Sequence, residues 1–203
     1  QGFGGRIEYV PNGVPRCTEP LAGTKDLAVL NTPDPHTSER MLDRVCAAEL
    51  FKKEAGDRYS ILGWIEGPAA EAGDLRGVAR FMMDLYDDDA FACELMDRCT
   101  EVAIDFALAQ IKAGCDTIGM GDAICSQLPP DIYERLIQPR QKRIVTAVRA
   151  AGAYFKLHIC GNIPHLLPGV ADLRVDILDV DHMVEMTDAR AAVADTVTLA
   201  GNI

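Results

Sequence analysis

The sequence contains the stretch Tyr154-Phe155-Lys156-Leu157-His158-Ile159-Cys160-Gly161-Asn162, in which apolar residues alternate with others until a Gly-Asn pair interrupts the run. This pattern predicts a short strand that ends in a turn. Side chains two positions apart on a strand point to the same face, so we expect His158 and Cys160 to project together. Such a pair could supply two ligands to Zn²⁺. Taken alone the triplet is a weak signal, because free cysteine is often simply buried.

Strand-like and helix-like segments alternate on both sides of this stretch, which predicts βαβ units and a parallel sheet. Strands are expected near residues 61, 117, 155, 176 and 197, and helices over about 38–55, 74–86, 88–113, 130–151, 163–171 and 187–194. A complete eightfold barrel usually needs about 250 residues. We therefore predict an α/β fold, a partial (β/α)₈ TIM-type barrel with parallel strands that is truncated at both ends.

The N-terminal part is predicted to form a hairpin rather than a strand of the parallel sheet. Two β-prone runs, Arg6–Val10 and Val14–Cys17, flank an Asn-Gly turn and predict a hairpin. We divide the chain into residues 1–58, the hairpin and helix that precede the visible barrel strands, and residues 59–203, the partial barrel. The apolar run 60–66 predicts a strand buried on both faces, and we expect Trp64 and the Met82-Met83 pair in the core.

Composition narrows the function classes. A net charge of −11 argues against a nucleic-acid partner. There is no apolar run of about 18 residues, so no membrane span is expected, and the first residues show no signal-peptide pattern. The seven cysteines are odd in number and contain no C-x-x-C pair, which favours a reducing, cytoplasmic location over a disulfide framework.

Polar residues gather where the predicted strands end, and ligands of parallel α/β folds bind at these carboxyl ends. Asp122 could bind a ligand there or simply cap the segment that follows it. His182 could be a solvated loop residue, and His165 a surface or second-sphere residue. The strand ends carry Glu66-Gly67-Pro68, Asp122, His158-x-Cys160, Asp181-His182 and Gly201-Asn202.

A series of short motifs resembles the uroporphyrinogen decarboxylase superfamily, and within it the corrinoid methyltransferase branch. The resemblance covers nearly the whole chain, and the motifs are specific through their order and spacing rather than singly. They are Gly13-Val14-Pro15-Arg16, Gly67-Pro68-Ala69, Leu75-Arg76-Gly77, Ala113-Gly114-Cys115-Asp116, Gly121-Asp122-Ala123, Leu128-Pro129-Pro130-Asp131-Ile132-Tyr133, His158-Ile159-Cys160-Gly161-Asn162 and Leu199-Ala200-Gly201-Asn202-Ile203.

The resemblance implies a (β/α)₈ barrel with its active site at the mouth, and a zinc-dependent transfer of a methyl group between a methylated corrinoid and a small thiol. The corrinoid would be methylcobalamin or a separate corrinoid protein. The branch uses a His-x-Cys pair and a later Cys as zinc ligands. His158 and Cys160 match the pair, and the third ligand would lie beyond Ile203, so we expect the zinc site within this chain to be incomplete.

The remaining site residues are hypotheses. We assign Asp181 as a provisional metal ligand that a substrate thiol displaces, and Asp122 to the catalytic set, where it would hold a histidine or the substrate. Gly67, Asn162 and His182 are assigned to substrate binding.

Two alternatives stay open. Uroporphyrinogen decarboxylases act without metal, through a catalytic Asp in a segment that would precede Gln1. A non-catalytic corrinoid- or tetrapyrrole-binding protein is the third reading, although the chain has no Asp-x-His-x-x-Gly corrinoid motif. Zinc analysis separates the first two readings, and methyl transfer separates the first from the third.

Overall fold

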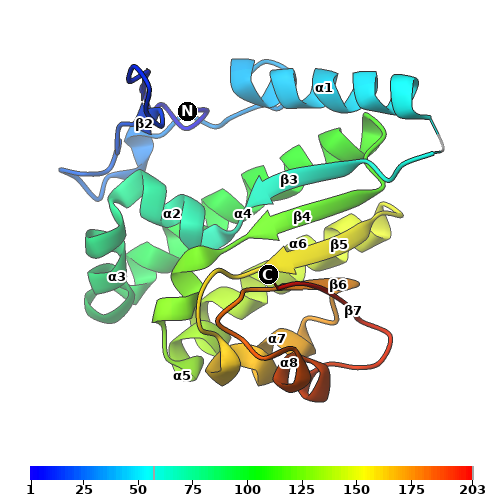
Figure 1. Ribbon diagram of the computed structural model, residues 1–203. Helices are drawn as coiled ribbons and strands as arrows, with labels where there is room; N and C mark the ends of the chain where they lie inside the picture. The colour runs from blue at the N-terminus through cyan, green and yellow to red at the C-terminus, as the bar shows by residue number, and fades with distance from the viewer. Residues whose placement is uncertain (57, 203) are drawn as a thin grey trace.

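A five-stranded parallel sheet forms the centre of the fold (Figure 1). The computed structural model describes residues 1–56 and 58–202. The strands pair in chain order, and helical segments connect each strand to the next, as the alternating pattern predicted. Among the described residues the outer strands have no further partner, so the sheet is open like part of a barrel. The strands are β3 (Leu62–Glu66), β4 (Thr117–Gly121), β5 (Tyr154–His158), β6 (Ile177–Val180) and β7 (Thr198–Gly201).

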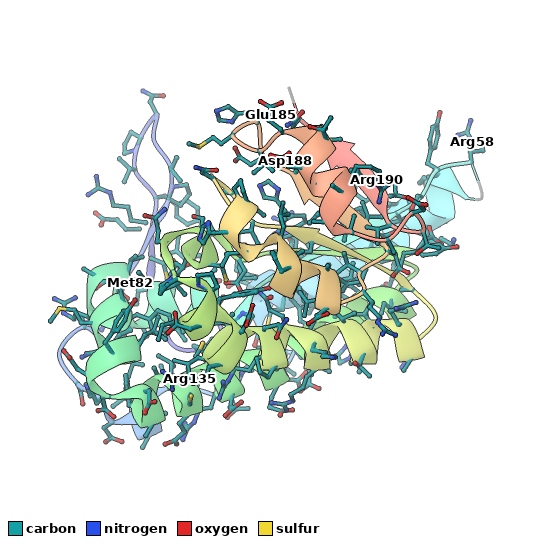
Figure 2. The ribbon with its side chains drawn as sticks, turned by 90° about the horizontal axis from the view of Figure 1, so that it is seen from below. Arg58, Met82, Arg135, Glu185, Asp188 and Arg190 are labelled. Carbon is teal, nitrogen blue, oxygen red and sulfur yellow. The ribbon has the colours of Figure 1, made fainter. Side chains whose placement is uncertain are left out.

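Helices cover one face of this sheet, and α1 lies beside α4 at the β3 edge (Figure 1). Figure 2 shows the molecule from below, with Met82 of α3 on one side and Arg190 of α8 on the other. None of the helices in the described ranges has the length and apolar character needed to cross a membrane. The α-helices are α1 (Glu39–Ala55), α2 (Pro68–Arg76), α3 (Val78–Asp87), α4 (Asp89–Lys112), α5 (Pro130–Ile132), α6 (Gln138–Ala150), α7 (Leu167–Asp172) and α8 (Met186–Ala192). Shorter turns are η1 (Leu27–Val29), η2 (Ala123–Gln127), the π-helical η3 (Tyr133–Ile137) and η4 (Pro164–Leu166).

The region predicted as one helix over 74–86 contains two. The first, α2, begins at Pro68 directly after β3, since proline is well suited to the first position of a helix. It ends at Arg76, and the φ of 86° at the next residue, Gly77, lies in the left-handed region that favours glycine. Sequence periodicity alone missed this early start and the break.

The face of the sheet that packs against the helices is apolar. Ile65, Met120, Leu157 and Leu178 lie side by side on neighbouring strands, and each is at most 2% exposed. Burying a side chain of this size stabilises the fold by about 1.5–3 kcal/mol. This row fixes the register of the strands, because a slip by one residue would turn polar side chains toward the helices.

The opposite, open face carries two rows of side chains that matter for function. The rim row, at the carboxyl ends, consists of Glu66, Gly121, His158, Asp179 and Ala200; the inner row consists of Trp64, Gly119, Lys156, Ile177 and Thr198.

Two predictions of burial are corrected by this arrangement. Trp64 is 38% exposed and Leu62 is 49% exposed, so β3 is not buried on both faces. The Trp64 indole lies over β4, where a Cβ on Gly119 would come within 2.4 Å of it. Met83 is 62% exposed and does not belong to the core, whereas Met82 packs partly against it.

The N-terminal segment forms the predicted hairpin and is tied to α2 and α3 by charge. Strands β1 (Ile7–Glu8) and β2 (Arg16–Cys17) pair antiparallel. The buried carboxylate of Asp84 lies 2.7 Å from both Arg76 Nε and Lys25 Nζ. The division of the chain at residue 58 stays a prediction, and the predicted family motif ending at Ile203 extends one position outside the described residues.

Candidate metal centre

His158 and Cys160 meet where β5 leaves the sheet. His158 is the last residue of β5 and belongs to the rim row, and Cys160 follows two positions later. The distance between His158 Nε2 and Cys160 Sγ is 3.0 Å. The thiol is exposed and the imidazole is half-buried, so both groups can be reached from the open face.

Asp181 completes a group of three potential metal ligands. One ligand atom from each of His158, Cys160 and Asp181 lies within 4.8 Å of the other two. The Asp181 carboxylate is held in place by two backbone amides, Gly161 N–H donating to Oδ2 and Met183 N–H donating to Oδ1, each at 2.9 Å. These bonds favour the ionised form and lower the pKa of Asp181.

The orientation of the His158 ring is set by β6. His158 Nδ1 lies 3.1 Å from the Asp179 carbonyl oxygen. A carbonyl only accepts hydrogen bonds, so Nδ1 carries the proton and Nε2 is left free to accept from Cys160 or to bind a metal. The Asp179 carboxylate itself is paired with Lys156 Nζ at 2.8 Å.

The chemistry of the donors fits Zn²⁺, which binds nitrogen, sulfur and carboxylate oxygen, and which in catalytic sites has three protein ligands and one open position. Burial raises the pKa of the Cys160 thiol, and the negative charges of Asp181, Glu66 and Asp179 add to the shift. A cation bound among these groups would relieve their repulsion and favour the thiolate. The expectation of an incomplete site refers to a further cysteine beyond Ile203, and it stays a prediction.

The Asp122 side chain is not one of the three clustered ligands and lies in a fully buried hydrogen-bond network, while the Asp122 backbone N–H donates to the His158 carbonyl oxygen at 3.1 Å. Ala70 N–H donates to Oδ1 at 2.7 Å and Gln141 Nε2 donates to Oδ2 at 2.8 Å, while Gln141 Oε1 accepts from the Tyr133 hydroxyl at 2.7 Å. Asp122 therefore caps the N-terminus of α2, whose preceding residue Gly67 has no side chain to do so. It makes no side-chain cap to the segment after it, so that predicted alternative is wrong. The catalytic role assigned to Asp122 stays a prediction.

The three residues assigned to substrate binding occupy different surroundings. Gly67 is buried against Asp122, and a Cβ on it would lie 2.3 Å from the Asp122 carboxyl carbon. Asn162 is exposed next to the ligand group. The His182 side chain is 71% exposed, as a loop histidine should be, and its Nδ1 lies 3.0 Å from Asp181 Oδ1. Their roles in substrate binding stay predictions.

Sequence reasoning overlooked Lys156 and Asp179, which form an ion pair beside His158. It placed Glu66 at the end of a strand without assigning it a role, and the structure puts Glu66 in the rim row on β3. A period-two reading from His158 identifies Lys156, but only the strand register places Asp179 and Glu66 at the same level as His158. His165 is at the surface, as predicted, with Nε2 3.0 Å from the Leu128 carbonyl oxygen.

Comparisons with known proteins point to one family. The family model described as uroporphyrinogen decarboxylase (URO-D) matches residues 1–203. The methylcobamide:CoM methyltransferase MtaA of Methanosarcina barkeri is 30% identical over 161 residues, which are 77% of this chain and 46% of the relative. The uroporphyrinogen decarboxylase of Methylococcus capsulatus is 26% identical over 212 residues, which are 97% of this chain and 58% of the relative.

A solved structure agrees with this result. A methyltransferase from Methanosarcina mazei superimposes with a TM-score of 0.89 at 25% identity, over 100% of this chain and 60% of that protein. This chain thus spans about half to three fifths of the length of the relatives it matches. These relatives are named as enzymes of two kinds, methyltransferases and decarboxylases.

Proposed function

The chain belongs to the uroporphyrinogen decarboxylase family, and we propose that the intact protein is a zinc-dependent methyltransferase that moves a methyl group between a methylated corrinoid and a small thiol. The methyl donor would be methylcobalamin or a separate corrinoid protein. The proposal concerns the whole protein, because this chain covers 46% of the relative named as a methylcobamide:CoM methyltransferase.

One observation carries the proposal. A nitrogen, a sulfur and a carboxylate oxygen from His158, Cys160 and Asp181 gather within 4.8 Å at the carboxyl ends of β5 and β6. A decarboxylase that acts without metal has no need of such a group, whereas a reaction that activates a thiol does. A zinc ion held there would keep a coordinated thiol deprotonated, and thus nucleophilic, near neutral pH.

The chain's own residues have distinct parts in this scheme. His158 offers Nε2 because its Nδ1–H is committed to the Asp179 carbonyl. Asp181 would be a provisional zinc ligand whose place a substrate thiol could take. Asn162 and His182, exposed at the same rim, would contact the substrate, and the family resemblance implies a cysteine as a further zinc ligand of the intact protein.

The test is a comparison of two cysteine variants of the intact protein. Cys160→Ala removes the sulfur ligand, and we expect zinc affinity to fall by at least about 10-fold, the effect of losing even a supporting group of a metal site. Methyl transfer from methylcobalamin to 2-mercaptoethanol should fall with it. Cys46→Ala removes an exposed cysteine on α1 and should leave both unchanged. Zinc content and transfer that survive in Cys160→Ala would refute the scheme.

A second candidate is a decarboxylase that acts on a tetrapyrrole without metal. It is favoured by the decarboxylase from Methylococcus capsulatus, which matches 97% of this chain. This candidate predicts activity that is insensitive to a strong chelator, whereas the methyltransferase should lose its activity and regain it when zinc is returned.

A further inference from the structure

Glu66 faces the candidate metal centre across a strip of β4 around Gly121, which has no side chain of its own. It shares the rim row with Gly121 on β4 and His158 on β5, so two interstrand spacings, about 10 Å, separate its Cα from that of His158. The intervening rim residue, Gly121, has no side chain of its own, and the edge of the Trp64 indole lies over it. A small molecule between the carboxylate and the His158–Cys160 pair would therefore rest on the indole.

The Glu66 side chain leans over this strip rather than away from it. A Cβ placed on Gly121 would lie 3.6 Å from Glu66 Oε2 and 3.1 Å from the Trp64 indole. The indole forms the floor below the carboxylate, which lies over Gly121 of β4. The negative charge of Glu66 also contributes to raising the pKa of the Cys160 thiol.

We propose that Glu66 is the general base that accepts the proton of the substrate thiol, an inference that rests on the proposed function. In this step the S–H bond breaks, an O–H bond forms on a Glu66 carboxyl oxygen, and the electron pair stays on sulfur. The sulfur pair then attacks the methyl carbon of the methylated corrinoid. The electrons of the broken cobalt–carbon bond remain on the corrinoid, and the thioether is released.

The other carboxylates near the rim are already committed. Asp179 is paired with Lys156, Asp181 accepts two backbone amides, and Asp122 is buried beneath α2. Glu66 has no lysine, arginine or histidine within ion-pair distance in residues 1–56 and 58–202. It is the carboxylate that both faces the open strip and remains free to take up a proton.

The surroundings of Glu66 tune it for this task. Although the residue is exposed at the end of β3, partial desolvation by its neighbours raises the pKa of Glu66 to about 7; the charge of Glu71 adds to the shift, and a hydrogen bond from Trp64 opposes it. A base with a pKa near the working pH is the most effective proton acceptor. The charged groups whose fields act on Glu66 are Glu71 and Asp74 on α2 and Asp122 after β4, and Glu66 in turn acts on Cys160 after β5. Glu66 also lines a cavity of about 450 Å³ together with Arg40, Arg44 and Cys99.

The experiment compares Glu66→Gln with the exposed α1 variant Glu49→Gln in the zinc-loaded intact protein. Calorimetric titration with 2-mercaptoethanol, in two buffers that differ in ionisation enthalpy, counts the protons released to solvent on binding. Above pH 7 the wild type and Glu49→Gln should release fewer protons than Glu66→Gln, because Glu66 retains part of them. This readout needs no methyl transfer.

Transfer rates supply the second arm. With 2-mercaptoethanol, which is protonated near neutral pH, Glu66→Gln should slow transfer about 100-fold; with thiophenol, which is already ionised, it should slow it by less than about threefold. Equal proton release in wild type and Glu66→Gln, or equal slowing with both thiols, overturns the assignment. Thiol binding with the expected proton count but without methyl transfer supports Glu66 and refutes the proposed function. Failure to bind the thiol overturns both.

Discussion

Replacing Asp122 by asparagine should stabilise the protein above pH 6. Burial raises the pKa of the Asp122 carboxyl from 3.8 to about 6, against the hydrogen bonds from Gln141 and Ala70 that favour its charged form. The raised value means that the folded state binds the proton more tightly than the unfolded state does. The contribution of Asp122 to stability is therefore fully present below pH 3.8 and is lost as pH rises to about 6.

The loss follows from the shift of about two pKa units, at 1.36 kcal/mol each, and amounts to about 2–3 kcal/mol between pH 4 and pH 7.5. Asparagine has nearly the same shape and no charge. Its amide can donate to Gln141 Oε1 if the Gln141 amide turns over and donates to the Tyr133 hydroxyl instead. The difference in unfolding free energy between wild type and Asp122→Asn isolates this one group, because every other titration is common to both.

The assay is urea unfolding of both proteins from pH 4 to pH 8. The wild type should lose about 2–3 kcal/mol relative to Asp122→Asn across this range. Asp122→Ala, which leaves two buried donors unpaired, should be destabilised by about 2–5 kcal/mol at every pH. A pH-independent difference between wild type and Asp122→Asn would refute the reasoning. Methyl transfer by Asp122→Asn should stay within about tenfold of wild type, and a loss of about 100-fold or more would instead support the catalytic assignment.

Two further substitutions, each with a matched control, test the packing against Asp122 and the buried ion pair of Asp84. Gly67→Ala should destabilise the protein by at least about 1–3 kcal/mol in urea unfolding, since its Cβ would lie 2.3 Å from the Asp122 carboxyl carbon. Gly23→Ala, where a Cβ meets nothing within 4 Å, should be close to neutral. Asp84→Ala should cost about 3–5 kcal/mol because it leaves buried positive charge without its partner. Glu94→Gln, which removes the exposed ion pair between Glu94 and Arg98 on α4, should cost less than about 1 kcal/mol, and equal losses for Asp84→Ala and Glu94→Gln would contradict the burial argument.

The alternating strand pattern in the sequence predicted most of the fold and part of the candidate metal centre. Alternation in residues 154–160 put Phe155 and Leu157 on the helix side and His158 on the other, and the register of β5 agrees with it. Patterns within one segment are sufficient here, because the period of a strand depends on its own backbone.

Contacts between segments could not be predicted in this way. The cap that Asp122 provides to α2 joins residues 52 positions apart, and the sequence around Asp122 favours a local cap equally well. The position of Trp64 on an open face depends on Gly119, on another strand, leaving room for the indole. The position of Glu66 opposite His158 likewise depends on the register between β3, β4 and β5, which the sequence of one strand alone does not determine.

The same geometry explains how one scaffold can serve relatives with different chemistry. The helix-facing row of Ile65, Met120, Leu157 and Leu178 maintains the sheet and takes no part in the metal-ligand group. The ligand atoms come from the strand exits just beyond it, where a side chain can change without disturbing the core. Overall similarity to methyltransferases and decarboxylases therefore identifies the family but does not choose between them. The choice depends on the residues that follow β5 and β6, and a thiol, an imidazole and a carboxylate whose ligand atoms lie within 4.8 Å of one another there favour metal-assisted chemistry.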